Sequence, residues 1–424
     1  MIPPLSLPSH LPEPPASRLA VRVTKDALRQ IRGGHPWVFD ASITSLSHEG
    51  EPGELAVVFG ERREFVAIGL YDPASPIRVR VLHHGRPTTI DAAFWRTRLD
   101  AALARRAELV ASASTTGWRL IHGENDGLPG VVIDRYDTTL VAKIYSEAWY
   151  PHLGDVLAAA VAGCAGAGLD VDRVVVRLSR QLRQGDTHGL VDGMVVLGSE
   201  PDGPVEFLEN GLRFGADVIA GQKTGHFLDQ RENRALVATL AQDREVLDVF
   251  ACTGGFSVHA ASGGAVGVTS IDLSHRSLDV AAENMARNAG LPRVAASRHE
   301  LEVADAFGAM SRRVEAGERY DLVIVDPPSF AHNQRDRPGA LDAYRRLATL
   351  GVELTAPRGM FVQSSCSSRV TAPEFRELVS EVVTASGRRW ELRAETGHAA
   401  DHPVGFAQGA YLKTMFCRLE PRRA

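Results

Sequence analysis

The sequence is poor in cysteine and lacks long hydrophobic runs. Its 424 residues include only Cys164, Cys252, Cys366 and Cys417, and none of these forms a CxxC pair. This pattern argues against a zinc site or a disulfide framework, so we expect no bound metal and reduced thiols in a cytoplasmic protein. No run reaches about 18 apolar residues, and the N-terminus lacks the basic and apolar regions of a signal peptide. We therefore expect no membrane segment.

The chain also lacks a strong charge of either sign. The formal net charge is -5, and hydrophobic and charged residues make up 44% and 23% of the chain. This balance is typical of soluble globular proteins, and the length predicts two or three domains. A small negative charge argues against a large nucleic-acid surface but is compatible with a local basic patch.

The N-terminal part predicts a tail followed by a small β-barrel. Residues 1–17 are rich in proline and serine, which is typical of a disordered segment. Residues 18–84 contain short β-rich runs separated by glycine and proline turns. Their basic residues, which form a candidate RNA-binding surface, are Arg22, Lys25, Arg29, Arg32, Arg62, Arg63, Arg78 and Arg80.

Two further domains are predicted after the barrel. Residues 88–205 combine strand-like runs with helical segments and predict a small α+β middle domain. From residue 206 to 424, strand-like and helical segments alternate, as in EVLDVF followed by FSVHAAS. This alternation predicts an α/β fold, a mostly parallel sheet with helices on both faces.

A candidate cofactor turn follows the first strand of this α/β domain. In such sheets, ligands bind beyond the carboxyl ends of the strands. The first strand ends at DVF, and ACTGGF then enters a helix, with two glycines that let a ligand approach the backbone. The turn does not fit GxGxxG, which disfavours a dehydrogenase. Its candidate binding residues are Asp248, Phe250, Thr253, Gly254, Gly255 and Phe256.

Two more acidic residues follow the next strands. Asp272 ends the second strand, 18 residues after Gly254, where a carboxylate can accept hydrogen bonds from both ribose hydroxyls. Asp305 follows the third strand, and two interpretations stay open for it. It contacts an adenine amino group, or it is the N-cap of the next helix.

A candidate reacting centre lies at the ends of the fourth and fifth strands. The fourth runs into Asp326 and two prolines that fix the backbone, and the fifth ends at Cys366. If these strands are neighbours, Asp326 and Cys366 lie side by side. One reaction that needs a cysteine beside a carboxyl group is methyl transfer to C5 of a cytosine. This carbon is too weakly nucleophilic to attack a sulfonium methyl group, but addition of a thiolate to C6 activates it. A carboxyl group that serves N3 completes this minimum set.

With these residues in view, the chain resembles the RlmI-like bacterial 23S ribosomal RNA cytosine-C5 methyltransferases over about residues 20–420. The similarity lies in GGHPWVFDASI, GENDGLPGVVIDRY, GQKTGHFLDQRENR, DVFACTGGFSVHA, DPPSFA, SSCSS and ADHP, and in their order. It implies a PUA-like RNA-binding barrel, a middle domain and a Rossmann-like methyltransferase domain that uses S-adenosyl-L-methionine. It also implies 23S ribosomal RNA, or a large-subunit precursor, as the partner, and a homodimer is compatible with it.

The resemblance also implies roles for individual residues. Cys366 is the nucleophile, Asp326 is its acid/base partner, and Asp272 and Asp305 contact the ribose and adenine. Phe227, Asp229 and Arg231 border the cofactor. The sequence departs from the family at Cys252, where tyrosine is frequent, and at Ser329, where lysine is frequent.

Two alternatives remain at this stage. One is an RNA methyltransferase that acts on another atom, such as guanine N7, as in a related branch that shares DPP[ST]F but has no cysteine at the position of Cys366. The other is a catalytically silent RNA-binding or ribosome assembly factor. The presence of all the residues expected for catalysis disfavours the second alternative.

Overall fold

The computed structural model describes residues 4–331 and 333–422, which form two compact units. The first three residues of the predicted tail lie outside the described residues, as do 332 and 423–424 of the predicted methyltransferase domain. The first unit comprises residues up to 207, together with 216–226 and 400–406, and the second comprises 208–215, 227–399 and the chain from 407 onward.

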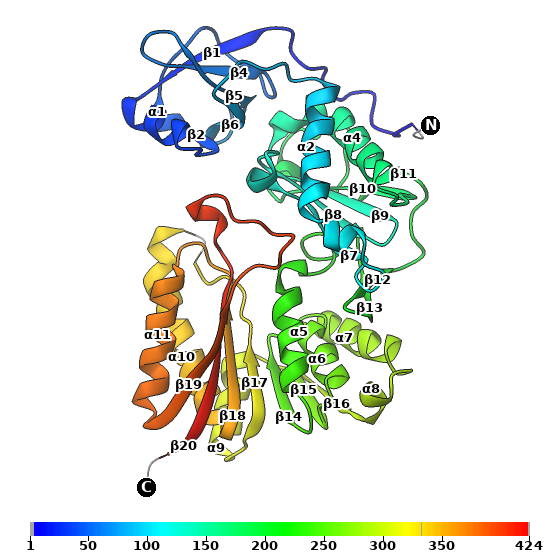
Figure 1. The fold of residues 1–424 in the computed structure, drawn as a ribbon, viewed down its shortest axis with the longest axis vertical. Coiled ribbons are helices and arrows are strands. Elements are labelled where there is room, and N and C mark those ends of the chain that lie inside the picture. The colour runs from blue at the N-terminus through cyan, green and yellow to red at the C-terminus, as the bar shows by residue number, and fades with distance from the viewer. Residues whose placement is uncertain (1–3, 332, 423–424) are drawn as a thin grey trace. The chain divides into compact units, whose positions relative to one another are not determined.

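The first unit begins with the predicted barrel, a six-stranded sheet of order β2-β6-β5-β4-β1-β3 (Figure 1). Only β1 and β4 pair in parallel, and the other neighbours are antiparallel. The strands are β1 Arg18–Val23, β2 Trp37–Phe39, β3 Ile43–Leu46, β4 Leu55–Phe59, β5 Phe65–Tyr71 and β6 Ile77–His84.

A short helix that the sequence analysis did not predict, α1 (Lys25–Arg32), interrupts the barrel after β1. The Thr24 side chain caps it by accepting a hydrogen bond from the Ala27 N–H, at 3.4 Å. Its Leu28 and Ile31 enter the barrel core, and its basic residues stay on the opposite, exposed face.

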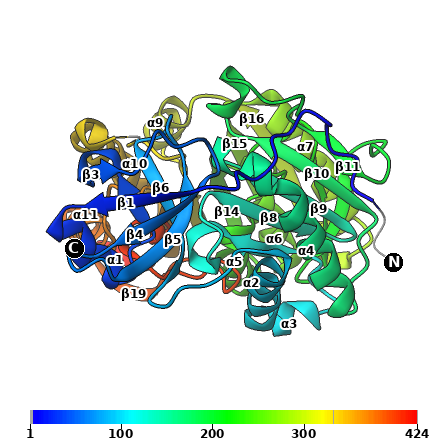
Figure 2. The same ribbon diagram turned by 90° about the horizontal axis from the view of Figure 1, so that it is seen from above.

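The middle domain has a five-stranded sheet of order β11-β10-β9-β8-β7. Its strands and main helices are β7 Gly117–His122, β8 Val131–Tyr136, β9 Thr139–Ile144, β10 Arg173–Leu178, β11 Met194–Leu197, α2 Ala92–Arg105, α3 Ala107–Val110 and α4 Leu153–Gly166. Helices α2 and α4 pack against one another (Figure 2). Leu70 and Leu82 of the barrel belong to the same buried core as Trp95 and Trp149, so barrel and middle domain share a core.

The structure differs from the expected disordered tail at residues 4–17. This segment has no helix or strand, but its Ser6 N–H donates to the Val196 carbonyl at 2.7 Å. Leu5, Leu7 and Leu11 pack against the core of the middle domain. Three leucines therefore provide apolar contacts that the proline-rich and serine-rich composition obscures.

The second unit is built on a seven-stranded sheet of order β16-β15-β14-β17-β18-β20-β19. The first five strands of this order run in parallel, whereas β20 is antiparallel to both of its neighbours. The strands are β14 Glu245–Val249, β15 Gly267–Asp272, β16 Arg298–Val303, β17 Tyr320–Val325, β18 Thr355–Ser365, β19 Arg388–Thr396 and β20 Lys413–Arg422.

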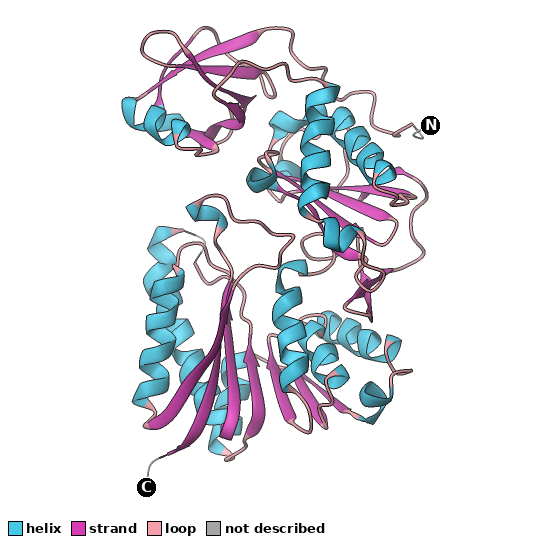
Figure 3. Cartoon of the chain, in the orientation of Figure 1, coloured by secondary structure: helices cyan, strands magenta, loops and turns pink. Residues whose placement is uncertain are grey.

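Helices lie on both faces of this sheet (Figure 3), as the α/β prediction requires. They are α5 Arg231–Leu240, α6 Gly255–Ser262, α7 His275–Arg287, α8 Pro292–Ala296, α9 Ala306–Glu315, α10 Arg337–Leu354 and α11 Ala372–Ala385. The prediction of a mostly parallel sheet is confirmed, and the antiparallel β19–β20 pair is an addition to it.

The C-terminal half is not one continuous unit from residue 206 to 424. A hairpin of β12 (Val205–Glu209) and β13 (Leu212–Ala216) comes first, and the segments 216–226 and 400–406 then pack within the first unit. The Thr224 hydroxyl donates to the Asp134 carboxylate at 2.5 Å, and the Asp401 carboxylate accepts from the Arg119 N–H at 2.7 Å. Across the described ranges, no helix is long and apolar enough to cross a bilayer.

Candidate active site

The carboxyl ends of the parallel strands meet at one edge of the seven-stranded sheet. The Ala251 N–H donates to the carbonyl of Ile271, and the Asp326 N–H donates to that of Val249, at 3.0 and 3.2 Å. In the same way, the Ala304 N–H donates to the Asp272 carbonyl at 3.0 Å. These hydrogen bonds bring the residues that follow β14, β15, β16 and β17 to a common edge, where an α/β sheet binds its ligand.

The turn between β14 and α6 has an unusual backbone. Phe250, Cys252 and Gly254 have φ values of 65°, 49° and 75°, in the left-handed region that favours glycine. A Cβ atom on Gly254 would lie 2.8 Å from the Cβ of Ala281 in α7. Two non-glycine residues with positive φ are a form of strain that concentrates at ligand-binding turns.

Asp272 holds this turn from the end of β15. One of its carboxylate oxygens accepts from the Cys252 N–H at 2.9 Å, and the other accepts from the Ser274 N–H at 2.8 Å. The side chain is partly exposed, so its remaining lone pairs can accept from ligand hydroxyls. A turn closed to a larger residue at Gly254 and a carboxylate beside it suit the ribose of a nucleoside cofactor.

The other predicted residues of the turn are mostly buried. Asp248 is completely buried, and its carboxylate accepts from the Ser257 hydroxyl at 2.6 Å. Burial, opposed by that hydrogen bond, raises the pKa of Asp248 to about 7. Phe256 is buried in α6, and the Thr253 carbonyl accepts from the Asn284 side chain at 2.9 Å.

Asp305 is the N-cap of α9. It is exposed, and its carboxylate accepts from the Gly308 N–H at 2.8 Å. The capping interpretation is therefore confirmed, and it leaves a second carboxylate oxygen at the end of β16.

The segment that precedes β14 contributes a short 3-10 helix, η5 (Leu228–Gln230), with Phe227 at its N-cap. The Asp229 carboxylate accepts from the Tyr411 hydroxyl at 2.9 Å, and Arg231 is buried at the start of α5. Gln230, which the sequence analysis did not single out, donates from its side-chain amide to the Asp326 carboxylate at 2.9 Å. Only its place within GQKTGHFLDQRENR could have drawn attention to it.

The strands that lead to Asp326 and Cys366 are neighbours, which is the condition that the sequence analysis set for these two residues to lie together. Strands β17 and β18 are parallel neighbours, with Val325 opposite Gln363. The Cys366 thiol lies 3.8 Å from the carbonyl oxygen of Pro327, the residue after Asp326. Cys252, at the cofactor turn, is a second thiol of this unit, and burial raises its pKa to about 11.

The environment of Asp326 favours its protonated form. Burial raises the pKa of this carboxyl group to about 7, and the nearby carboxylates of Asp229 and Asp248 act in the same direction. The Gln230 hydrogen bond opposes them. A carboxyl group with such a pKa can donate or accept a proton near neutral pH.

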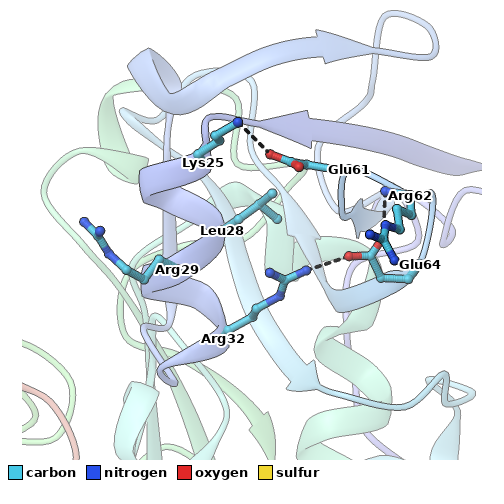
Figure 4. Close-up of a pocket in the computed structure, with 7 residues that line it drawn as sticks. All are labelled: Lys25, Leu28, Arg29, Arg32, Glu61, Arg62 and Glu64. Carbon is cyan, nitrogen blue, oxygen red and sulfur yellow. Dashed lines mark hydrogen bonds and ion pairs between the residues drawn. The ribbon is translucent and has the colours of Figure 1, made fainter.

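The barrel carries a separate, basic pocket. Its volume is about 490 Å³, and it is lined by Lys25, Leu28, Arg29, Arg32, Glu61, Arg62 and Glu64 (Figure 4). Lys25 pairs with Glu61 at 3.4 Å, and Arg32 pairs with Glu64 at 2.6 Å. Lys25, Arg29 and Arg32 share one face of α1. Arg80, by contrast, is buried beside Glu124 of the middle domain, so it does not belong to a surface cluster.

Comparisons with known proteins identify the two kinds of domain in the chain. A family model of S-adenosylmethionine-dependent methyltransferases matches residues 178–386, and a PUA-like domain model matches residues 21–84. A solved structure from Streptococcus mutans, described as a SAM-dependent methyltransferase, has a TM-score of 0.79 at 21% identity. The similarity covers 94% of this chain and 99% of that one. The cofactor is thus S-adenosylmethionine.

Similar proteins along the whole chain extend this result. A ribosomal RNA large subunit methyltransferase of Deinococcus radiodurans is 48% identical over 414 residues, which cover 96% of this chain and 99% of the relative. Ribosomal RNA large subunit methyltransferase I of Tolumonas auensis is 32% identical over 400 residues, 94% of this chain and 98% of the relative. The chain therefore belongs to the family of ribosomal RNA large subunit methyltransferases.

Proposed function

We propose that this protein methylates C5 of a cytosine in 23S ribosomal RNA through a covalent bond between Cys366 and C6 of the base. The names of the relatives support large-subunit ribosomal RNA as the substrate. The observation that carries the choice of cytosine C5 is the Cys366 thiol, which lies 3.8 Å from the Pro327 carbonyl at the strand end beside Asp326. Methyl transfer to an exocyclic amine or to guanine N7 needs no such thiol.

We also propose roles for the residues around the cofactor. We assign the ribose hydroxyls to Asp272 and the adenine amino group to the free carboxylate oxygen of Asp305. Phe227, Asp229 and Arg231 border the cofactor from the segment before β14. The residues of the turn that surround it are Asp248, Phe250, Thr253, Gly254, Gly255 and Phe256.

Two of the chain's own groups, Cys366 and Asp326, activate the base for methyl transfer. The Cys366 thiolate adds to C6, and the Asp326 carboxyl group gives its proton to N3, so that electron density moves to C5. S-adenosylmethionine, when bound, would supply an electrophilic methyl group to that carbon and leave as S-adenosylhomocysteine. The Asp326 carboxylate then serves N3 as a hydrogen-bond acceptor. Loss of the C5 proton to a base and return of the N3 proton to the Asp326 carboxylate expel the Cys366 thiolate and restore the aromatic ring.

The experiment compares two thiols of the same unit. Cys366→Ala should abolish methylation of ribosomal RNA and leave S-adenosylmethionine binding intact, because only the nucleophile is lost. Cys252→Ala is the matched control and should keep substantial activity. Mass mapping of the RNA product identifies the modified atom. Cytosine methylation by Cys366→Ala would overturn the proposal, and a methyl group on guanine N7 would replace it with the alternative.

A further inference from the structure

A buried ammonium group joins β20 to the loop that follows Cys366. Lys413 is the first residue of β20, opposite Ser365 of β18, and is 3% exposed. Its Nζ donates to the carbonyl oxygens of Ser367, Val370 and Tyr411, the last two at 2.5 and 3.1 Å. Ser367 and Val370 belong to the loop between Cys366 and α11, so one side chain fixes the backbone of this loop at two points.

Backbone carbonyl groups, and not a carboxylate, stabilise the positive charge of Lys413. Three carbonyl oxygens match its three N–H donors, which offsets the cost of burial. Across residues 4–331 and 333–422, no carboxylate forms an ion pair with it. The titratable groups that act on it are the thiol of Cys366 and, from α11, the carboxylate of Glu374. The thiol of Cys366 also acts on the Tyr344 phenol of α10, as does the carboxyl group of Asp326.

We infer that Lys413 is a positioning residue for Cys366, which holds the loop after the thiol and stabilises the thiolate by its positive charge. A nearby cation favours the charged form of a cysteine, and the thiolate is the form that attacks. The effect on catalysis rests on the function proposed above, whereas the effect on the thiol does not. Burial lowers the pKa of Lys413 to about 8, so the group is mostly charged at pH 7.

A purely structural role makes a different prediction. If Lys413 only ties the loop to β20, its replacement changes the stability of the unit and leaves the ionisation of Cys366 unchanged. The pH dependence of Cys366 alkylation separates the two roles, because iodoacetamide reacts with the thiolate. Peptide mass mapping of the full-length protein gives the rates at Cys366 and Cys252 in the same sample.

In Lys413→Met we expect the midpoint of Cys366 alkylation to rise by about one pH unit, which lowers the rate at pH 7 about tenfold. Cys252 serves as the internal reference and should keep its profile. Lys143→Met is the matched control. Lys143 also donates to a backbone carbonyl, that of Lys223, but it belongs to the other compact unit. This control should leave the Cys366 profile unchanged.

An unchanged Cys366 midpoint in folded Lys413→Met would overturn the inference. If that variant does not fold, Lys413→Arg decides, since arginine keeps its charge at every accessible pH. Its Cys366 midpoint should lie at or below that of the wild type, and a higher midpoint would contradict the charge effect. These alkylation rates need no RNA, so they stand even if Cys366→Ala were to retain cytosine methylation.

Discussion

At the scale of single residues, the candidate site combines a carboxyl group whose pKa is raised by its surroundings with a thiol on the neighbouring strand. Asp326 is partly buried beside other carboxylates, which holds its pKa near 7. Cys366 lies at the end of the neighbouring strand, next to a loop held by an ammonium group. A protonated carboxyl group and a thiolate are the two states that addition to a cytosine requires.

Asp326→Asn should change how stability depends on pH. Because the folded-state pKa of Asp326 is raised from 3.8 to about 7, its contribution to stability is full below pH 4 and is lost as the pH rises through 7. Between pH 4.5 and 8, the free energy of unfolding should fall by ~2 kcal/mol less in Asp326→Asn than in the wild type. Urea unfolding without cofactor measures this. Asp305→Asn at the exposed N-cap of α9 is the control. An equal pH dependence of stability in the two variants would contradict the raised pKa of Asp326.

At the scale of elements, the turn between β14 and α6 depends on its backbone conformation. Gly254→Ala would place a Cβ atom 2.8 Å from Ala281 at a φ of +75°. We expect this change to destabilise the protein by roughly 1–3 kcal/mol and to weaken S-adenosylmethionine binding. Gly290→Ala is the matched control in the same unit, because a Cβ atom there meets no atom within 4 Å. Calorimetry and thermal unfolding of both variants decide. Equal values for the two would show that the turn tolerates the side chain.

A helix or strand is easiest to predict from the sequence when its residues are all in the same environment, such as the buried interior of a sheet. Strand β17, YDLVIV, is buried over residues 322–325, which read as a continuous apolar run, so its place in a parallel sheet could be predicted. Strand β19, RRWELRAET, lies at the sheet edge and is mostly charged and exposed, so its short alternation of Trp390, Leu392 and Ala394 did not single it out as a strand. Helix α1 has only eight residues, too few for a clear helical period.

Some residues of the candidate site could likewise be predicted from the sequence, and others could not. Acidic and cysteine residues at strand ends could be placed together because parallel strands end at one edge. Gln230 and Lys413 could not be placed at the site from the sequence. Gln230 donates to the Asp326 side chain just after β17, and Lys413 donates to backbone carbonyls of a loop that is distant in the sequence. Backbone carbonyls have no sequence signature, so a contact of this kind appears only in the structure.

At the scale of the whole molecule, the first unit combines segments from distant parts of the chain. The N-terminal leucines and residues 216–226 and 400–406 all pack within it. Such contacts depend on tertiary structure and not on local pattern. The barrel and the middle domain also share a core. Deleting the barrel would remove Leu70 and Leu82 and would expose to water the middle-domain residues that pack against them.

We propose that the basic pocket on the barrel binds RNA phosphates, and substitutions test this better than a deletion. Replacing Lys25, Arg29 and Arg62 by Gln should reduce the slope of log affinity against log salt concentration by up to ~0.9 per lost phosphate contact. Filter binding of ribosomal RNA fragments over a salt series measures the slope. Arg319→Gln, an exposed position before β17, is the control. An unchanged slope in the triple variant would place the RNA contacts elsewhere.

The most direct test of the account is to trap the covalent intermediate. RNA that carries 5-fluorocytosine at the target keeps its C5 substituent, because fluorine cannot leave as a proton, so the bond to the enzyme persists. We predict a stable adduct in the wild type whose RNA-linked peptide contains Cys366, and no adduct in Cys366→Ala. An adduct that maps to Cys252, or methylation of the fluorinated RNA without any adduct, would contradict the mechanism.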